Sequence, residues 1–315
     1  MSASFKVVDL GVLPGGGTSA AYGINAAGTV VGNADVPHNI VDAFESNGAA
    51  TPILKPIHGG AVTHAYSVNS RGDVTGETSV GNYQHAYFFS NGVMHDLGTL
   101  GGHTSFAYAI NDADTIVGGS YIRGDKLVHA FIWTPLTGMK DLGTLGGGFS
   151  LAYAISPSGQ IAGYSTNARG QNHAFLDVSG KMQDLGTLPG GALSISYAIN
   201  ATGQMAGAAK IGNNENAFIC AAGKFTNLGT LGGSSSLAYG INNSAAAVGL
   251  SAIKGSTTTH AFVYHGGKMY DLNQEIAPGS GWTLLGAFAI NNAGEIAGMG
   301  MIHGKTHGFL LIPIA

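Results

Sequence analysis

Short apolar runs, separated by glycine, asparagine and serine, follow one another in an order that repeats along the whole chain. One copy of the repeat reads Asp96-Leu-Gly-Thr-Leu-Gly-Gly102, Ala107-Tyr-Ala-Ile-Asn111, Ile116-Val-Gly118 and His129-Ala-Phe131. The runs contain Val, Ile, Tyr and Phe, and they are too short and too closely bounded by glycine to be helices, so they predict β-strands. The aromatic residue of the second run recurs every 42 to 49 residues, at Tyr22, Tyr66, Tyr108, Tyr153, Tyr197, Tyr239 and Phe288.

A repeat of this length is typical of a propeller, a solenoid or another array of similar units. We number the four strands predicted for each repeat from the one that carries the recurring aromatic residue, so that the fourth is the Asp-Leu-Gly element, as in 94–97. Tight turns such as 69–72 and 90–92 join successive strands, because Asn and Gly tolerate the positive φ that such turns need. Each repeat therefore predicts a four-stranded antiparallel sheet whose strands pair in chain order.

The two ends of the chain favour a closed ring over an open array. The last repeat supplies a third strand at 307–312 but lacks a fourth, whereas the chain begins with an unmatched fourth strand at 5–11. Pairing these two strands uses both and leaves no sheet edge exposed, while an open array would need polar capping repeats that the sequence lacks. The predicted fold is all-β: a seven-bladed β-propeller with four antiparallel strands per blade, closed by the N-terminal strand, in one domain over residues 1–315.

Composition and charge narrow the range of partners. The 52 glycines fall at fixed offsets between apolar runs, as turn residues do, and charged residues make up only 10% of the chain. The formal net charge of -4 lacks the basic excess that nucleic-acid binding needs, so no nucleic-acid partner is expected. There is no stretch of 18 apolar residues, which argues against a membrane-spanning helix, and residues 1–6 do not resemble a signal peptide.

Cys220 is the only cysteine, so the sequence excludes a disulfide framework and a thiolate metal cluster. It lies within a strand pattern, which predicts a small buried apolar residue. One histidine per repeat, spread around a ring, does not gather the three or four ligands of a metal site. We therefore expect no metal, no cofactor and a monomer.

The recurring Asp-Leu-Gly-Thr-Leu-Gly-Gly, Ala-Tyr-x-Ile-Asn and His-Ala-Phe elements resemble the HAF-repeat family of bacterial, extracellular repeat proteins. The resemblance covers essentially the whole chain, since the elements recur in the same order and at similar spacing. Asp42 and Asn216 depart from it, because each stands where other repeats have histidine. The resemblance implies a repeat architecture and an extracellular or periplasmic location, and it implies no particular activity.

One face of the predicted ring is the better candidate for binding. We call it the crossover face, because it carries the loops between second and third strands and the crossings from one sheet to the next. Its loops differ in sequence from repeat to repeat, whereas the turns of the opposite face are short and nearly uniform. Variable loops on a rigid scaffold are where binding sites are usually built.

Charged and aromatic residues in these loops are the candidate ligand-binding residues. Five consecutive sheets each place at least one cation there, and an arc of cations could attract an acidic glycan, although exposed loops also carry charge for solubility. The first two sheets instead carry Asp35 and Glu77. The predicted ligand-binding set is Arg123, Lys126, Arg169, Lys210, Lys254, Lys305, Tyr83, Tyr121 and His303.

A histidine opens the third strand in five repeats, and an aspartate follows in the fourth strand. The short turn should place Tyr87 opposite Asp96, and Phe175 opposite Asp184, so that each histidine lies diagonally across from the aspartate on the same side of the sheet. Because the pair recurs around the ring, we interpret it as a structural hydrogen bond rather than as an oriented catalytic base. The histidines are His85, His129, His173, His260 and His307, and the aspartates are Asp96, Asp141, Asp184 and Asp271. The recurring Tyr and Ile of the first strand are likewise expected to pack between neighbouring sheets.

The leading functional hypothesis is a non-catalytic binding module that recognises a carbohydrate or another cell-surface ligand through the crossover face. One alternative is an enzyme such as a polysaccharide lyase, with Tyr121, Arg123 and His303 as its candidate residues. An enzyme should have one deep polar pocket, whereas a lectin-like ring should have several similar shallow ones. Another alternative is a scaffold that binds only protein.

Overall fold

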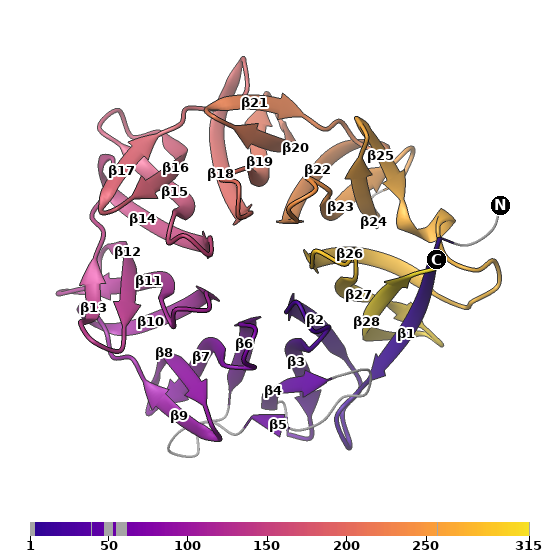
Figure 1. Cartoon of the computed structure of the whole chain (residues 1–315), viewed down its shortest axis with the longest axis horizontal. Helices are drawn as coiled ribbons and strands as arrows, with labels where there is room; N and C mark the ends of the chain where they lie inside the picture. The colour runs from indigo at the N-terminus through magenta and orange to yellow at the C-terminus, as the bar shows by residue number, and fades with distance from the viewer. Residues whose placement is uncertain (1–3, 39, 47–52, 55–61, 257, 315) are drawn as a thin grey trace.

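The computed structural model describes residues 4–38, 40–46, 53–54, 62–256 and 258–314. These residues form seven four-stranded antiparallel sheets arranged around a central axis, as Figure 1 shows. In every sheet the strands pair in the predicted order, and the strand with the recurring aromatic residue lies innermost. The seven-bladed propeller predicted from the sequence is confirmed.

The innermost, first strands are β2 (Ser19–Ile24), β6 (Thr63–Val68), β10 (Gly101–Ile110), β14 (Gly146–Ile155), β18 (Gly191–Ile199), β22 (Gly232–Ile241) and β26 (Thr283–Ile290). The second strands are β3 (Val30–Val36), β7 (Val74–Val80), β11 (Ile116–Ile122), β15 (Ile161–Asn167), β19 (Met205–Ile211), β23 (Ala247–Ile253) and β27 (Ile296–Ile302).

The third strands are β4 (Ile40–Ser46), β8 (Tyr83–Ser90), β12 (Val128–Thr134), β16 (Asn172–Val178), β20 (Asn214–Ala221), β24 (Thr259–His265) and β28 (Lys305–Pro313). The outermost, fourth strands are β5 (Ile53–Leu54), β9 (Val93–Asp96), β13 (Gly138–Asp141), β17 (Lys181–Asp184), β21 (Lys224–Asn227), β25 (Lys268–Asp271) and β1 (Phe5–Gly11). A 3-10 turn, η2 (Leu272–Gln274), follows β25. No helix of the described residues is long and apolar enough to cross a membrane.

Strand β1 closes the ring by completing the last blade. It pairs antiparallel with β28, and Val7 lies opposite Leu311 in that register. Figure 1 shows the first and last strands side by side at one point of the ring. The predicted closure by the N-terminal strand is therefore confirmed, and the ring has no gap at which a whole blade edge is left unpaired.

Apolar side chains of adjacent blades pack against one another and form the core. The third strand of each blade supplies one large, fully buried aromatic residue. These residues are Phe44, Tyr87, Phe131, Phe175, Phe218, Phe262 and Phe309. The cluster between the blades of β8 and β10 is typical, because it joins Phe88 and Leu97 of one blade to Ile110 and Ile116 of the next. Cys220 is also fully buried, as predicted, and burial raises the pKa of its thiol to about 11.

A buried serine in the first strand joins neighbouring blades. The hydroxyl of Ser150 in β14 accepts a hydrogen bond from the Ala130 amide of the preceding blade at 2.8 Å, and it donates to the Gly143 carbonyl at 2.5 Å. The same two kinds of bond are made by Ser19, Ser105, Ser194 and Ser236. Because these serines are almost fully buried, the five crossings that they join are held by polar groups shielded from competing water.

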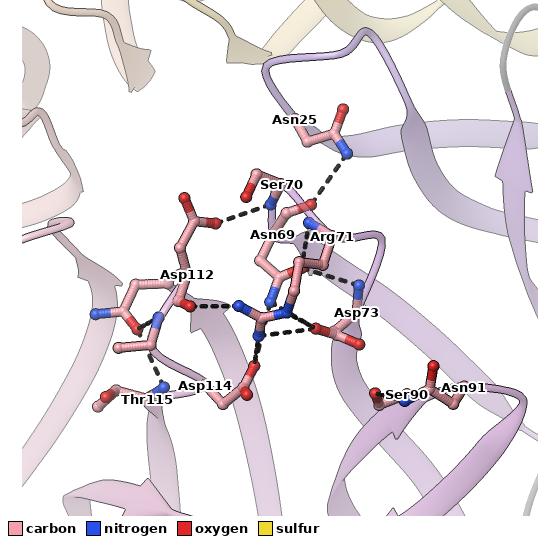
Figure 2. Close-up of polar contacts among 12 residues, drawn as sticks. Asn25, Asn69, Ser70, Arg71, Asp73, Ser90, Asn91, Asp112, Asp114 and Thr115 are labelled. Atoms are coloured by element: carbon pink, nitrogen blue, oxygen red, sulfur yellow. Dashed lines mark hydrogen bonds and ion pairs between the residues drawn. The ribbon is translucent and has the colours of Figure 1, made fainter.

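Asparagine side chains link the blades on the opposite face. The Asn25 side-chain amide donates to the Asn69 carbonyl of the next blade at 3.0 Å, while its oxygen accepts from the amide of Ala27 in its own turn. Figure 2 shows this link beside a charged one, in which Arg71 contacts Asp73 of its own blade and Asp114 of the next. In six of the seven turns between first and second strands, the Asn therefore shapes the turn and also contacts the neighbouring blade, and Ser156 takes its place in the seventh.

Candidate functional site at the mouth of the channel

Seven aromatic side chains form a closed ring around the channel. Each is the extra residue of a β-bulge in the first strand: Ala107 and Ala109 pair with consecutive residues of β11, and Tyr108 between them has no partner. Neighbouring ring centroids are 4.9–5.9 Å apart all the way round, from Tyr22 through Tyr239 and Phe288 back to Tyr22. The expectation that these residues are buried between sheets is wrong, since they are half-buried and line a cavity on the axis.

The bulge explains why the second strands carry a glycine directly after Val or Ala. In β15, a Cβ added to Gly163 would lie 1.9 Å from the carbonyl oxygen of Leu151, so only glycine fits there. The glycine allows the first strand to approach closely while the bulge turns Tyr153 toward the channel. The repeated motif therefore helps to place the aromatic ring.

Next to the aromatic ring, on the side of the crossover face, the channel wall is asymmetric. The residue two positions before the ring residue is apolar and large in four blades, namely Phe106, Leu151, Ile195 and Leu237. It is Ala20 in the blade of β2, where the small residue lines a cavity, and Gly286 in the blade of β26, where Phe288 and Leu250 lie close by. In the blade of β6 it is His64, which lies directly opposite Glu77 of β7.

His64, Glu77 and Tyr66 form a polar triangle in this wall. Oε1 of Glu77 lies 2.9 Å from Nδ1 of His64 and accepts a hydrogen bond from the Tyr66 hydroxyl at 3.0 Å. The Tyr66 hydroxyl is also 3.1 Å from Nδ1 of His64. The side chains are only 23% exposed for His64 and 12% for Glu77, so solvent screens these charges less than at the surface.

Two cavities meet at this level. One, of about 340 Å³, is lined by residues of the first two blades and the last, among them Ala20, Asn33, Asp35, His64 and Met299. The other, of about 470 Å³, is lined by the seven aromatic residues together with Leu250 and Met299. Tyr22 and Met299 line both cavities, so the two are contiguous. Their volumes fall within the range of small-molecule sites, roughly 300–1,000 Å³.

Asp35 and Asn33 complete the polar side of the first cavity. Asn33 accepts a hydrogen bond from the Ala65 amide of the next blade at 2.8 Å. Asp35 accepts from the backbone amides of Gly17 and Thr18. Burial alone would raise the pKa of Asp35, but the two amides hold it below its usual value, so this carboxylate is negatively charged at neutral pH.

Burial raises the pKa of the tyrosines in the ring. The effect is large for Tyr66, Tyr108, Tyr153 and Tyr197, and the nearby Glu77 carboxylate raises the pKa of the first two further. The tyrosines are therefore neutral at physiological pH and can donate hydrogen bonds.

The predicted histidine–aspartate hydrogen bonds are present in four blades, and His307 makes the same kind of bond with Asp9, which was not among the predicted aspartates. Tyr87 pairs with Asp96, and Phe175 with Asp184, as the short turns predicted. Nδ1 of each histidine lies 2.7–3.0 Å from a carboxylate oxygen of Asp96, Asp141, Asp184, Asp271 or Asp9. Each aspartate also accepts a backbone amide two residues later, such as Gly98 for Asp96. In the blade with Asn216, Asn227 makes that turn contact instead.

The predicted cations lie on the crossover face and are exposed. Arg123, Lys126, Arg169 and Lys254 lie in the loops, as expected. The loop assignment is wrong for four other residues, because the second and third strands extend further toward this face than their apolar residues indicate: Lys210 is in β19, Tyr121 in β11, Tyr83 in β8 and Lys305 in β28. None of the six cations lines either cavity, and we call these six residues the cationic rim.

The structure does not bring the three candidate enzyme residues together. Tyr121 and Arg123 belong to the blade of β10, whereas His303 lies in the turn between β27 and β28. Two complete blades separate these positions in the ring (Figure 1). Tyr83 instead stacks on His103, with ring centroids 4.6 Å apart, and His103 contacts Asp125. Among the described residues, no group of three or more His, Cys, Asp or Glu is arranged to hold a metal ion.

His64 was not among the predicted site residues, and Glu77 was expected only as a loop charge. A signal was present, because both residues are polar at positions where most repeats have apolar or small residues. Their meeting depends on the register of β6 and β7, which places them directly opposite each other.

The fold and the site together define a seven-bladed propeller with one asymmetric cavity at the mouth of its channel. No protein-family model matches the chain, and no curated protein matches its sequence. The chain is similar in fold to the extracellular domain of a one-component system from B. thetaiotaomicron, with 10% identity and a TM-score of 0.56. The match covers 98% of this chain and 39% of that one.

Two further structures have a similar fold. The extracellular domain of a hybrid two-component system from B. thetaiotaomicron matches 99% of this chain and 41% of its own, with 12% identity and a TM-score of 0.52. YCF48 bound to a D1 peptide matches 100% of this chain and 98% of its own, with 9% identity and a TM-score of 0.52. At such identities the similarity shows the shared fold alone.

Proposed function

We propose that the protein is a non-catalytic binding module that takes a small ligand, or one end of a longer one, into the cavity at the channel mouth. The observation that carries this proposal is the asymmetry of the wall. Ala20 leaves space on one side, His64 and Asn33 supply polar groups there, and four other blades have a large apolar residue at the position of Ala20 and His64. A repeated scaffold does not need such differences for its own packing, whereas a specific site does.

A carbohydrate of the cell surface fits the chemistry of this cavity. A sugar presents apolar C–H faces and hydroxyl edges, and the cavity offers aromatic rings beside the hydrogen-bonding groups of His64, Asn33 and Asp35. We extend the proposal to an extracellular or periplasmic location and to membership of the HAF-repeat family. Both extensions rest on the repeated sequence elements.

Filling the cavity tests the assignment of the site. Ala20→Leu places at this position the kind of side chain that Leu151 and Leu237 already have in their blades, so the variant should fold. Binding to a panel of neutral, acidic and amino sugars should be lost in this variant. Ala192→Leu, on the exposed start of β18 and outside both cavities, is the matched control and should bind normally. Unchanged binding in Ala20→Leu would place the ligand elsewhere.

The triangle of His64, Glu77 and Tyr66 supports an enzyme as the second candidate. A histidine oriented by a carboxylate can act as a general base, and His64 lines a cavity that a substrate could enter. A turnover assay on acidic oligosaccharides separates the two candidates. Product formation that disappears in His64→Ala, while binding persists, would favour the enzyme.

A further inference from the structure

The charges around the cavity are negative, in contrast to those of the rim. Asp35 lines the cavity, and Glu77 lies one hydrogen bond behind the lining residues His64 and Tyr66. Among the described residues, neither cavity is lined by lysine or arginine. Because both carboxylates are partly shielded from solvent, their attraction for a positive charge in the cavity is stronger than at an open surface.

The dimensions of the aromatic ring suit a cation on the channel axis. Seven centroids spaced 4.9–5.9 Å apart in a regular ring lie about 6 Å from its centre, which is the range of cation–π attraction. A cation at the centre reaches all seven rings, and one displaced to a side approaches two or three of them more closely. Inorganic cations keep a tightly bound water shell, so an organic ammonium group fits this apolar ring better.

The tyrosines keep their attraction for a cation over the physiological pH range. Since burial raises the pKa of Tyr66, Tyr108, Tyr153 and Tyr197, their hydroxyls stay protonated and the ring itself carries no negative charge. The attraction on the axis therefore comes from neutral aromatic rings and from the two carboxylates at the mouth.

We propose that the cavity at the channel mouth selects a positively charged organic group, either a protonated amine or a quaternary ammonium, which the aromatic ring surrounds and Glu77 and Asp35 attract. This inference rests on the proposed binding function and specifies the ligand chemistry of the same site. Among carbohydrates it singles out amino sugars. The same charged group also occurs in trimethylammonium compounds and in lysine side chains.

A pair of isosteres provides the direct test. Choline and 3,3-dimethylbutan-1-ol have nearly the same shape, but only choline is charged. In calorimetric titrations at low salt, choline should bind at least about tenfold more tightly than the neutral alcohol. Equal affinity of the two, or no binding of choline, would overturn the proposal.

Two kinds of variant identify the groups responsible. Glu77→Gln removes the charge and retains hydrogen-bonding atoms for His64 and Tyr66, so choline binding should weaken by about tenfold, while the neutral alcohol should be unaffected. Tyr197→Leu removes one aromatic side chain and should weaken choline binding. Tyr197→Phe should retain choline binding, because Phe288 already occupies one of the seven positions. If Tyr197→Leu does not fold, Glu77→Gln alone decides the question.

Three further probes show which kind of compound carries the charged group that binds. They also allow this inference to fail separately from the proposed function. Glucosamine, N-acetylglucosamine and Nα-acetyl-lysine amide are titrated in the same way, and binding of glucosamine but not of N-acetylglucosamine would indicate an amino sugar. Neutral sugars that bind wild type but not Ala20→Leu, with no preference for charged probes, would leave the binding site standing and overturn the cation selectivity. Choline binding that survives in Ala20→Leu would instead contradict the site itself.

Discussion

His307 hydrogen-bonds with Asp9 at 2.9 Å, although the two residues lie 298 positions apart in the chain. The same kind of bond joins neighbouring strands of one continuous segment in four other blades, such as His85 with Asp96. In the last blade it joins the beginning of the chain to its end. The bond therefore reinforces the seam at which the ring closes, beside the pairing of β1 with β28.

Removing the closing strand should weaken the whole ring. Deletion of residues 1–11 leaves β28 without its outer partner and exposes a strand edge, so the melting temperature should fall and the protein should aggregate. Thermal unfolding and size-exclusion chromatography measure the two effects. Deletion of residues 1–3, which precede β1, is the control and should change neither. A truncated protein that stays monomeric at an unchanged melting temperature would refute the role of the seam.

The hydrogen bond to Asp96 raises the pKa of His85 above its ordinary value of 6.5, and the charge of Asp96 acts in the same direction, although burial opposes both. Because the folded pKa is the higher one, this contribution to stability is fully present below pH 6.5 and is lost as the pH rises through the folded value. An NMR titration of the His85 ring should show the raised pKa. In Asp96→Asn it should return toward 6.5, and an unchanged titration would contradict the hydrogen bond as its cause.

Tyr87 occupies the position that phenylalanine holds in the other six blades. Its side chain is fully buried, and within the described residues its hydroxyl has no hydrogen-bond partner. Tyr87→Phe should therefore increase the free energy of unfolding by about 1 kcal/mol, because an unsatisfied buried hydroxyl is removed. The reverse change, Phe175→Tyr, should decrease it in urea denaturation. A loss of stability in Tyr87→Phe would show that the hydroxyl does find a partner.

The cationic rim can be tested separately from the cavity. If it contributes to recognition of an acidic ligand, Arg123→Ala combined with Arg169→Ala should weaken binding, and added salt should weaken wild-type binding because exposed charges are screened over about 8–10 Å. Lys181→Ala with Lys224→Ala removes the same charge from the turns of the opposite face and should have little effect. Equal losses in both double variants would mean that only net charge matters.

The repeat predicted the fold in detail because each strand type is marked by its own residues. The order of strands, the closure by 5–11 and the pairing of Tyr87 with Asp96 all followed from tight turns and from counting positions. The predicted strand ends were less accurate. Strand pairing continues through polar residues such as Lys210, which carry no apolar signal. The family resemblance stays a prediction.

The site was harder to predict than the fold because it depends on departures from the repeat. The averaged motif presents Tyr66 as one of seven equivalent residues, and its contact with Glu77 appears only in the three-dimensional register. Neither His64 nor Ala20 matches a known short motif. A small residue in one blade leaves space, and another blade supplies a polar side chain. The sequence alone does not show that the two belong to one cavity, because this depends on how the blades lie around a common axis.

The β-bulge at each ring residue also has an evolutionary consequence. Tyr108 and its six counterparts are the unpaired residues of their strands, so exchanging one of them leaves strand register and blade packing unchanged. The channel wall can thus be altered at seven places, one mutation at a time, without rebuilding the scaffold. Phe288 is one such exchange already present, and a designer could use the same seven positions to give this propeller a new specificity.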